Sequence, residues 1–324
     1  MKRISARAKY LVILMVAFIA CAAIFASDYI TGASSWVSYQ TNQNIYHDGE
    51  LTVAGEIYSS DGVRLLSSSA NGMMYADDMN VRLATLHTIG DKNDSISNSI
   101  LTTKRDKLIG YNVLNGLFDS KSKEHEMQLT INAQLSSLAY QSLGANHGAV
   151  AIMNYKTGEV LTMVSKPSFD PDNPPSDDAS DEDGIYLNRV LNGLYVPGSI
   201  MKLVTTYAAI ENISDIESQT FDCQGGITIG DQWIECNGVH GHQTFEQALA
   251  NSCNVAFGLI ANQLGNDTLA NYVDKSGLTA STNIDGAKTS PSRFNLENAS
   301  SADLAWAGIG QYTTLVNPMQ FLEY

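Results

Sequence analysis

An 18-residue run without a charged side chain, Tyr10–Ser27, constrains this chain more than any other feature. A membrane-spanning helix needs about 20 mainly apolar residues, so we expect the run to form one transmembrane helix. Basic residues precede the run and Asp28 follows it. Because positive charge tends to stay on the cytoplasmic side, residues 1–9 should be a cytoplasmic tail, and everything after residue 27 should be extracytoplasmic.

Two other interpretations of this run remain open. A cleaved signal peptide needs small residues at its cleavage site, and Ile24-Phe25-Ala26 matches that pattern weakly. A lipoprotein would be anchored through Cys21, but Phe18-Ile19-Ala20 fits the usual preceding residues poorly. We therefore favour an uncleaved signal anchor over residues 10–27.

The charge of the chain argues against some classes of partner. Its 324 residues carry a formal net charge of −15, and four of the 19 Lys and Arg residues lie in the first nine positions. No acid lies there, so the rest of the chain carries −19. So acidic a body is poorly suited to bind nucleic acid or an anionic membrane surface. A hydrophobic fraction of 44% indicates a globular protein with room for two domains.

Residues 28–143 are expected to form an extracytoplasmic module. Gly55–Leu66 predicts two short strands around a Ser-Asp-Gly turn, and Leu129–Asn132 predicts another strand. Residues 97–117 show helical spacing, and a helix is expected at Gln134–Leu143. These segments hold no group of catalytic side chains, so we interpret the module as a pedestal that offers contacts to partners.

The segment that follows predicts a β-hairpin and an acidic loop. Strands at Gly148–Met153 and Glu159–Val164 flank a turn that contains Lys156-Thr157-Gly158. Seven acids lie in the loop that ends at Gly184. Their spacing does not fit a calcium-binding loop, so we expect a solvated surface loop.

A serine and a lysine three residues apart start the next helix. Val196-Pro197-Gly198 favours a helix entrance, and the apolar residues that follow predict a buried helix. Ser199 and Lys202 then share one helix face, with Cβ atoms about 5–6 Å apart. A buried lysine of lowered pKa can take the proton of a serine nucleophile, and a helix N-terminus can stabilise an oxyanion. The S-x-x-K pattern by itself is also common by chance.

Ser252 and Asn254 lie between two predicted helices. Thr244-Phe245-Glu246-Gln247 predicts a capping box that begins one helix, and Val255–Leu264 predicts a second, apolar helix. Side chains at such a junction can face a cleft, or they can simply cap the helices.

The cysteines allow more than one interpretation. Cys223 and Cys236 lie in the exported part and could form a disulfide. With His240 and His242 they could also bind zinc, but the spacing matches no standard zinc motif. We therefore predict no metal and no cofactor, and we expect Cys253 to be a small buried residue without a partner.

Together these motifs resemble class B penicillin-binding proteins. Ser199 and Lys202 match the S-x-x-K element, and Ser252 and Asn254 match S-x-N, 53 residues later. The flanking segments also match: Gly55–Leu66, Ser168–Asn173, Asn188-Arg189-Val190, Tyr195–Ser199, His240-Gly241, Ala248-Leu249, Ile309-Gly310-Gln311 and Asn317–Gln320. The resemblance implies an α+β penicillin-binding/β-lactamase-like transpeptidase fold over residues 144–324. In that fold helices flank an antiparallel sheet, and the membrane helix and the pedestal precede it.

The resemblance also implies an activity, that of a peptidoglycan D,D-transpeptidase. Ser199 would attack the carbonyl between the last two D-alanines of a stem peptide while Lys202 takes its proton. Ser252 would relay a proton to the departing D-alanine, and Asn254 would bind the donor peptide. β-Lactams would acylate the same serine. The implied partners are a membrane polymerase of glycan strands and other wall-synthesis proteins, with no nucleic acid.

One departure from the family is large. A third motif, K-T-G, should follow Asn317–Gln320 by several tens of residues, and the 324 residues do not contain it there. Lys156-Thr157-Gly158 precedes the nucleophile and is expected in a turn. We therefore expect this sequence to be the amino-terminal part of a longer protein and to be nearly inactive by itself.

Two alternative functions stay open. The first is a serine hydrolase of the D,D-carboxypeptidase or β-lactamase type, in which water attacks the acyl-enzyme. The second is a non-catalytic β-lactam sensor or a scaffold of a wall-synthesis complex. The anchor and the pedestal argue against a secreted β-lactamase, and a sensor would need more cytoplasmic or transmembrane machinery than nine residues and one helix.

Overall fold

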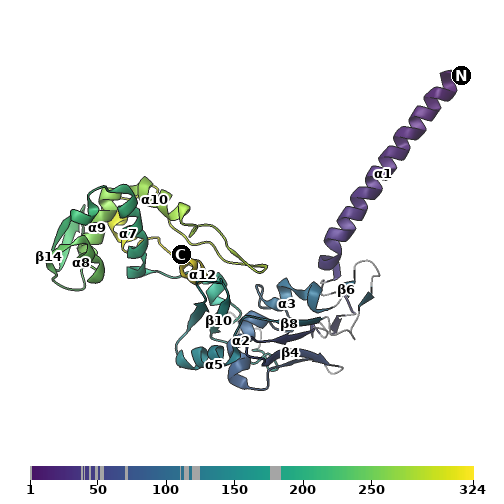
Figure 1. Ribbon diagram of the computed structural model, residues 1–324, viewed down its shortest axis with the longest axis horizontal. Coiled ribbons are helices and arrows are strands. Elements are labelled where there is room, and N and C mark those ends of the chain that lie inside the picture. The colour runs from purple at the N-terminus through teal and green to yellow at the C-terminus, as the bar shows by residue number, and fades with distance from the viewer. Residues whose placement is uncertain are drawn as a thin grey trace. The chain divides into compact units, whose positions relative to one another are not determined.

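A computed structural model describes residues 2–37, 39, 41–43, 45–47, 50–51, 55–69, 72–109, 111–112, 117–118, 125–175 and 184–324 (Figure 1). The chain divides into two compact units. Unit 1 comprises Met1–Ser137 with Phe169–Pro175, and unit 2 comprises Leu138–Ser168 with Ser176–Tyr324.

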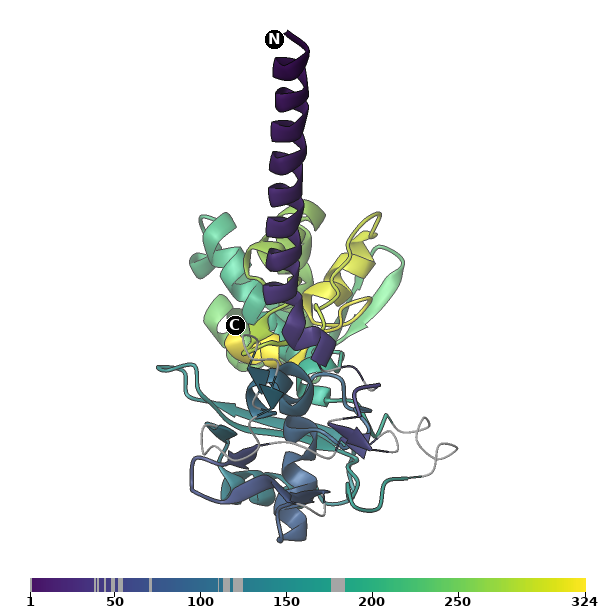
Figure 2. The same cartoon turned by 90° about the vertical axis from the view of Figure 1, so that its right-hand side faces the viewer.

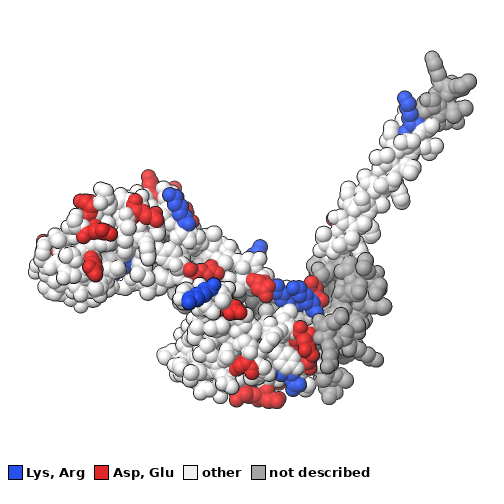
Figure 3. All heavy atoms as spheres, in the orientation of Figure 1, with Lys and Arg blue, Asp and Glu red and all other residues white. Residues whose placement is uncertain are grey.

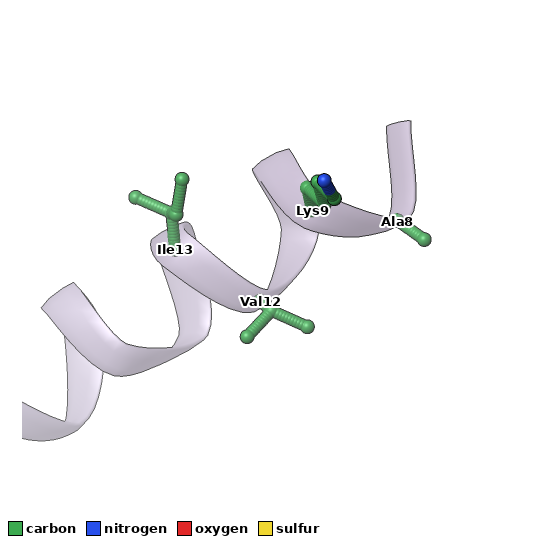
Figure 4. Close-up of a pocket in the computed structure, with 4 residues that line it drawn as sticks. All are labelled: Ala8, Lys9, Val12 and Ile13. Carbon is green, nitrogen blue, oxygen red and sulfur yellow. The ribbon is translucent and has the colours of Figure 1, made fainter. Parts of the chain in front are cut away.

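The amino-terminal helix α1 (Lys2–Val37) is continuous in both ribbon views (Figures 1 and 2). Its stretch Ala8–Gly32, which includes the predicted span 10–27, is long and apolar enough to cross a membrane. The side chains of this stretch are exposed, and its surface is largely free of charge (Figure 3). A shallow hollow along the helix is lined by Ala8, Lys9, Val12 and Ile13 (Figure 4). All four come from one helix, so the hollow is part of its outer surface and encloses no site.

The sheet of unit 1 has four strands in the order β5-β4-β3-β8. They are β3 (Glu56–Tyr58), β4 (Arg64–Ser69), β5 (Gly72–Tyr75) and β8 (Glu126–Gln128). The predicted strand pair around the Ser-Asp-Gly turn is confirmed as the antiparallel pair β3–β4. The Asp61 carboxylate in this turn accepts the N–H groups of Ala133 and Gln134, at 2.8 and 3.2 Å. These bonds join the turn to the start of helix α5 (Ala133–Ser142).

Two predictions for unit 1 need correction. The strand expected at residues 129–132 is wrong, because the strand β8 ends at Gln128 and the next residues lead into α5. The helical pattern of residues 97–117 produces only two single-turn helices. They are α3 (Ile100–Thr103) and α4 (Arg105–Leu108), followed by the strand pair β6 (Tyr111–Asn112) and β7 (Leu117–Phe118). Residues 110 and 113–116 of that prediction lie outside the described residues.

The acidic segment 169–175 belongs to unit 1 through ion pairs with helix α2 (Met79–Ile89). Arg82 contacts the carboxylates of Asp170 and Asp172, both at 2.9 Å. Burial acts to raise the pKa of Asp170, but hydrogen bonds and the charge of Arg82 outweigh it and lower that pKa. Residues 176–183 of the predicted surface loop lie outside the described residues. The remaining strands of unit 1 are β1 (Tyr46–His47) and β2 (Glu50–Leu51).

Unit 2 contains the predicted antiparallel hairpin, β9 (Gly148–Met153) and β10 (Val160–Lys166). Its turn holds Lys156-Thr157-Gly158, as expected. Gly158 has a φ of +76°, a left-handed conformation that glycine adopts without a Cβ clash.

Unit 2 also contains several helices and short strand pairs. The helices include α6 (Arg189–Asn192), α7 (Met201–Asn212), α8 (Phe245–Ala250), α9 (Asn254–Leu264), α10 (Asn266–Lys275), α11 (Ser301–Gly308) and α12 (Pro318–Glu323), with 3₁₀ turns at Gly198–Ile200 and Ile216–Ser218. The strand pairs are β11 (Thr220–Cys223) with β14 (Gly241–Thr244), β12 (Gly226–Ile229) with β13 (Gln232–Glu235), and β15 (Asn283–Ile284) with β16 (Ala287–Lys288). Acidic side chains are scattered over the face of this unit that Figure 3 shows.

Helix α9 lies in the core of unit 2 and packs against α7, α8 and α11 (Figure 1). Its side chains Phe257 and Ile260 are fully buried. A Cβ at Gly308 of α11 would lie 2.4 Å from the Cβ of Ala261, so this close helix contact depends on glycine. Because α9 is anchored in this core, the residues that directly precede it have a fixed position in unit 2.

Candidate active site

The predicted nucleophile lies in a 3₁₀ turn, Gly198–Ile200, that leads directly into α7. Gly198 has a φ of +56°, which explains why glycine follows the proline in this turn. Ser199 is exposed, whereas Lys202 is only 1% exposed. The Lys202 Nζ lies 3.1 Å from the Ser199 Oγ. The i, i+3 spacing thus places an accessible hydroxyl beside a buried amine, as the sequence predicts.

Three further oxygen atoms surround the Lys202 amine. Its Nζ lies 2.8 Å from the Ser252 carbonyl oxygen, 2.9 Å from the Ser252 Oγ and 2.7 Å from the Asn254 Oδ1. The Ser252 Oγ also donates to the Ser199 Oγ at 2.9 Å. The structure therefore brings all four predicted site residues together. We call Ser199, Lys202, Ser252 and Asn254 the serine–lysine cluster.

The junction between α8 and α9 positions the two residues of the second motif. The predicted capping box is confirmed, because the Thr244 Oγ1 accepts from the Gln247 N–H and the Gln247 Oε1 accepts from the Thr244 N–H. Ser252 follows with a φ of +52°, an unusual left-handed conformation for a residue with a Cβ. Cys253 then caps α9 through its Sγ, so neither Ser252 nor Asn254 is the cap. Their side chains remain available to Lys202.

Asn254 is held from both sides. Its Oδ1 accepts from Lys202, and its Nδ2 donates to the Glu235 carbonyl oxygen of β13 at 2.8 Å. Because one amide group serves both contacts, the orientation of the side chain is fixed.

Burial lowers the pKa of Lys202 below the usual lysine value. The aromatic ring of Phe257 lies beneath the amine, with its centroid 6.0 Å from Nζ. A lower pKa raises the fraction of neutral amine near neutral pH. Only the neutral amine can accept a proton from Ser199, so the environment favours a general base at this position.

A segment before the C-terminal helix supports the nucleophile turn. The Gly198 N–H donates to the Gly310 carbonyl oxygen at 2.9 Å. A Cβ at Gly310 would lie 2.2 Å from the Gly198 carbonyl oxygen, and Gly310 has a φ of +78°. The sequence identified Ile309-Gly310-Gln311 only as a family match, and the backbone contact with Gly198 gives its physical role.

Asn317 has a similar role in the approach to the nucleophile. Its Nδ2 donates to the carbonyl oxygens of Leu191 and Gly193, at 2.7 and 3.1 Å. Its backbone neighbour Val316 pairs with Tyr195 in an antiparallel bridge. The predicted Asn317–Gln320 match is thus explained by contacts that hold the chain just before Ser199.

Next to the second motif lies a group of sulfur and nitrogen atoms. The side-chain ligand atoms of Cys223, Cys236, His240 and Cys253 all lie within 4.8 Å of one another. We call these residues the cysteine–histidine cluster. The expectation that Cys253 has no partner is wrong, because its Sγ lies 3.8 Å from that of Cys236. Cys223 and Cys236 are free cysteines, and the structure does not contain the disulfide that the sequence left open.

His242, the other histidine weighed as a zinc ligand, does not join this cluster. It is exposed on β14 and pairs with Asp222 at 2.9 Å. The two histidines are two residues apart in the chain, but only His240 faces the cysteines.

Comparisons with known proteins identify the family and the fold of this chain. A model of the penicillin binding protein transpeptidase domain matches residues 148–324. Stage V sporulation protein D of Bacillus subtilis is 31% identical over 60% of this chain and 31% of its own length. Peptidoglycan D,D-transpeptidase PbpA of Mycolicibacterium smegmatis is 22% identical over 99% of this chain and 70% of its own. The chain thus spans about a third of the first relative and about two thirds of the second.

Solved structures share the fold. PBP2 of Pseudomonas aeruginosa superposes with a TM-score of 0.70 at 22% identity, covering 84% of this chain and 68% of that one. PBPA of Mycobacterium tuberculosis gives 0.69 at 20% identity, covering 83% and 69%. The predicted fold class is confirmed. This chain belongs to the penicillin-binding protein transpeptidase family and, within it, to the class B penicillin-binding proteins.

Proposed function

We propose that this chain carries the acylation centre of a peptidoglycan D,D-transpeptidase, with Ser199 as nucleophile and Lys202 as its general base. The observation that carries the proposal is the contact of Ser199 Oγ with Lys202 Nζ at 3.1 Å, with Ser252 Oγ 2.9 Å from both atoms. Relatives named peptidoglycan D,D-transpeptidase support the reaction class. They include PbpA of Mycolicibacterium smegmatis and MrdA of Acinetobacter baumannii.

The serine–lysine cluster provides a complete route for the proton during acylation. Neutral Lys202 takes the Ser199 proton as Oγ attacks the carbonyl carbon of the penultimate D-alanine. The C–N bond to the last D-alanine then breaks. Its nitrogen receives a proton from the Ser252 hydroxyl, which is replenished from the Lys202 ammonium. General acid–base help of this kind is typically worth about 10²–10⁴-fold.

The second half-reaction uses the same groups in reverse. An amine of a neighbouring stem peptide attacks the acyl-serine carbonyl and gives its proton to the Ser252–Lys202 pair. The ester bond breaks, the new amide forms the cross-link, and Ser199 regains its proton. Asn254 holds the donor peptide through its amide, and the N–H of Ser199 at the start of α7 stabilises the oxyanion. A β-lactam acylates the same serine.

The third family element is not provided by Lys156-Thr157-Gly158. That tripeptide forms the turn of the β9–β10 hairpin, whereas the family signature requires K-T-G after S-x-N. We expect residues 1–324 by themselves to react with fluorescent penicillin only weakly. Stable stoichiometric labelling of Ser199 in this 324-residue chain would contradict that expectation.

The membrane topology and the domain limits are part of the proposal. Helix α1 anchors the chain through residues 10–27, with residues 1–9 in the cytoplasm. Residues 28–143 form the pedestal, and residues 144–324 belong to the catalytic domain. A complex of Helicobacter pylori PBP2 with MreC is among the similar structures, which supports wall-synthesis proteins as partners. Protease added outside spheroplasts should degrade everything after the anchor and spare an amino-terminal tag.

A codon change in the native gene tests the function. Ser199→Ala should abolish acylation by penicillin and reduce peptidoglycan cross-linking in the source cells. If the wild-type protein released D-alanine without forming new cross-links, the result would instead favour a carboxypeptidase. Full cross-linking by the variant would favour a scaffold or a sensor and overturn the proposal.

A further inference from the structure

The cysteine–histidine cluster joins three separate segments of unit 2. Cys223 ends β11, Cys236 and His240 lie between β13 and β14, and Cys253 caps α9. Cys223 and Cys253 are fully buried, and Cys236 is 9% exposed. Sulfur and imidazole nitrogen are the ligands of structural zinc sites, and three cysteines with one histidine are a common set.

Two of the separations between ligand atoms fit a tetrahedral metal site. Zinc–sulfur and zinc–nitrogen bonds of about 2.3 and 2.0 Å place the ligand atoms of a tetrahedron roughly 3.5–3.8 Å apart. The Cys236 Sγ lies 3.8 Å from the Cys253 Sγ and 3.6 Å from the His240 Nδ1. A disulfide would require a sulfur separation of about 2.05 Å. The Cys236 and Cys253 sulfur atoms are therefore not bonded to each other, and all four ligand atoms, which lie within 4.8 Å of one another, are close enough to share one ion.

Backbone N–H groups at the start of α9 donate to two of the sulfur atoms. The Asn254 N–H donates to the Cys236 Sγ at 3.2 Å, and the Ala256 N–H donates to the Cys253 Sγ at 3.5 Å. Both N–H groups belong to the first turn of α9, an 11-residue helix whose N-terminus carries partial positive charge. Binding of Zn²⁺ would release three thiol protons, and the site would then carry one net negative charge.

We propose that Cys223, Cys236, His240 and Cys253 bind one structural zinc ion. With four protein ligands the site is closed to substrate, so its role is to position residues. Cys253 lies between Ser252 and Asn254, the two residues of the second motif. The zinc ion thereby fixes both residues beside Lys202. Zinc binding itself does not depend on the proposed reaction, whereas the positioning role rests on it. The proposal departs from the prediction, made from spacing alone, that no metal is bound.

Metal analysis of the purified chain tests the site. The 324-residue protein, purified without chelators or added metal, should contain one zinc per chain. X-ray absorption should show a shell of sulfur near 2.3 Å and nitrogen near 2.0 Å in a ratio of three to one. Absence of zinc together with a disulfide among Cys223, Cys236 and Cys253, detected by mass spectrometry, would overturn the proposal.

Two histidine variants provide a matched pair. His240→Ala should lose most of the zinc, whereas His242→Ala, two residues away on an exposed surface, should retain it. Equal zinc content in the two variants would contradict the proposed ligand set. Cys21→Ser, in the apolar helix, is a second control that should retain zinc.

A thiol-labelling experiment on the unaltered chain covers the case in which His240→Ala fails to fold. In detergent, an alkylating reagent should modify Cys223, Cys236 and Cys253 slowly. A chelator should accelerate labelling of those three by at least tenfold and lower the melting temperature. Unchanged labelling after chelation would refute the zinc site. Because Ser199→Ala should retain the zinc, failure of the proposed reaction would leave this result unaffected.

Discussion

The serine–lysine cluster and the cysteine–histidine cluster lie on either side of residues 252–254 and differ in accessibility. Ser199 is exposed and Lys202 buried, so one cluster joins a reachable hydroxyl to a shielded base. In the other cluster Cys223 and Cys253 are fully buried, and the four ligand atoms face one another. The contrast is consistent with the division of labour that we propose, in which one cluster reacts and the other holds its neighbour in place.

The largest effect is expected when the reactive cluster loses its nucleophile. Ser199→Ala, in the protein expressed from its own gene, should reduce labelling by fluorescent penicillin by at least 10³-fold, because no other group replaces the attacking oxygen. Its zinc content should equal that of the wild type. Residual labelling at another residue would show that Ser199 is not the nucleophile.

Lys202→Ala should have the next largest effect, a reduction of labelling by about 10²–10⁴-fold. In the wild type, the labelling rate should rise with pH through the lowered pKa of Lys202, since only the neutral amine accepts the serine proton. The variant should lose this dependence. Stopped labelling reactions across a pH series would measure both rates, and a wild-type profile that is flat in this range would exclude Lys202 as the base.

The sequence predicted one cluster better than the other for a physical reason. Ser199 and Lys202 are three residues apart on one helix, so helical geometry alone brings them together. The proximity of Ser252 and Asn254 to Lys202 depends on tertiary packing of α7 against α9, and only the family resemblance indicated it. Local periodicity carries no information about such contacts.

The sequence offers Cys223, Cys236 and His240 as possible zinc ligands but misses Cys253 and argues against the site, because tertiary structure assembles the cluster. Cys223 lies opposite Gly241 in the β11–β14 pair, which brings it next to His240. The β12–β13 hairpin returns Cys236 to the same place, where its N–H donates to the Gly225 carbonyl oxygen at 3.0 Å. The linear spacing of these residues matches no zinc motif, although their side chains converge. The wrong prediction of a strand at residues 129–132 in unit 1 has a similar cause, since parallel pairing with β3 fixes the position of β8.

Gly310 contacts the turn that holds Ser199, so its substitution should disturb the serine–lysine cluster most directly. Gly310→Ala places a Cβ 2.2 Å from the Gly198 carbonyl oxygen at a φ of +78°. Backbone strain and the clash together should destabilise unit 2 by about 3–4 kcal/mol and displace the turn of Ser199. Thermal unfolding and penicillin labelling would measure the two effects.

Gly277→Ala is a matched control for Gly310→Ala. Gly277 has a φ of +81°, and a Cβ there would meet nothing within 4 Å. It should cost only about 1–2 kcal/mol, from the left-handed backbone alone. Equal losses of stability in the two variants would show that the contact between Gly310 and Gly198 is not important.

Asn254 belongs to the serine–lysine cluster and also contacts the cysteine–histidine cluster, so it tests whether the two clusters can be separated. Its side chain accepts from Lys202 and donates to Glu235, whereas its backbone N–H donates to Cys236. Asn254→Ala removes the side-chain bonds and keeps the N–H. Penicillin labelling should fall roughly tenfold, for a loss of about 1–2 kcal/mol, and zinc should remain bound.

Asn254→Asp tests whether a charge at this position changes the protonation of Lys202. A carboxylate in place of an amide oxygen 2.7 Å from the Lys202 amine would favour the protonated lysine. The pH profile of labelling should therefore move to higher pH, which a purely structural role of Asn254 would not produce. Loss of zinc in Asn254→Ala would show that the two clusters do not act separately. An unchanged pH profile in Asn254→Asp would show that Asn254 does not influence the base.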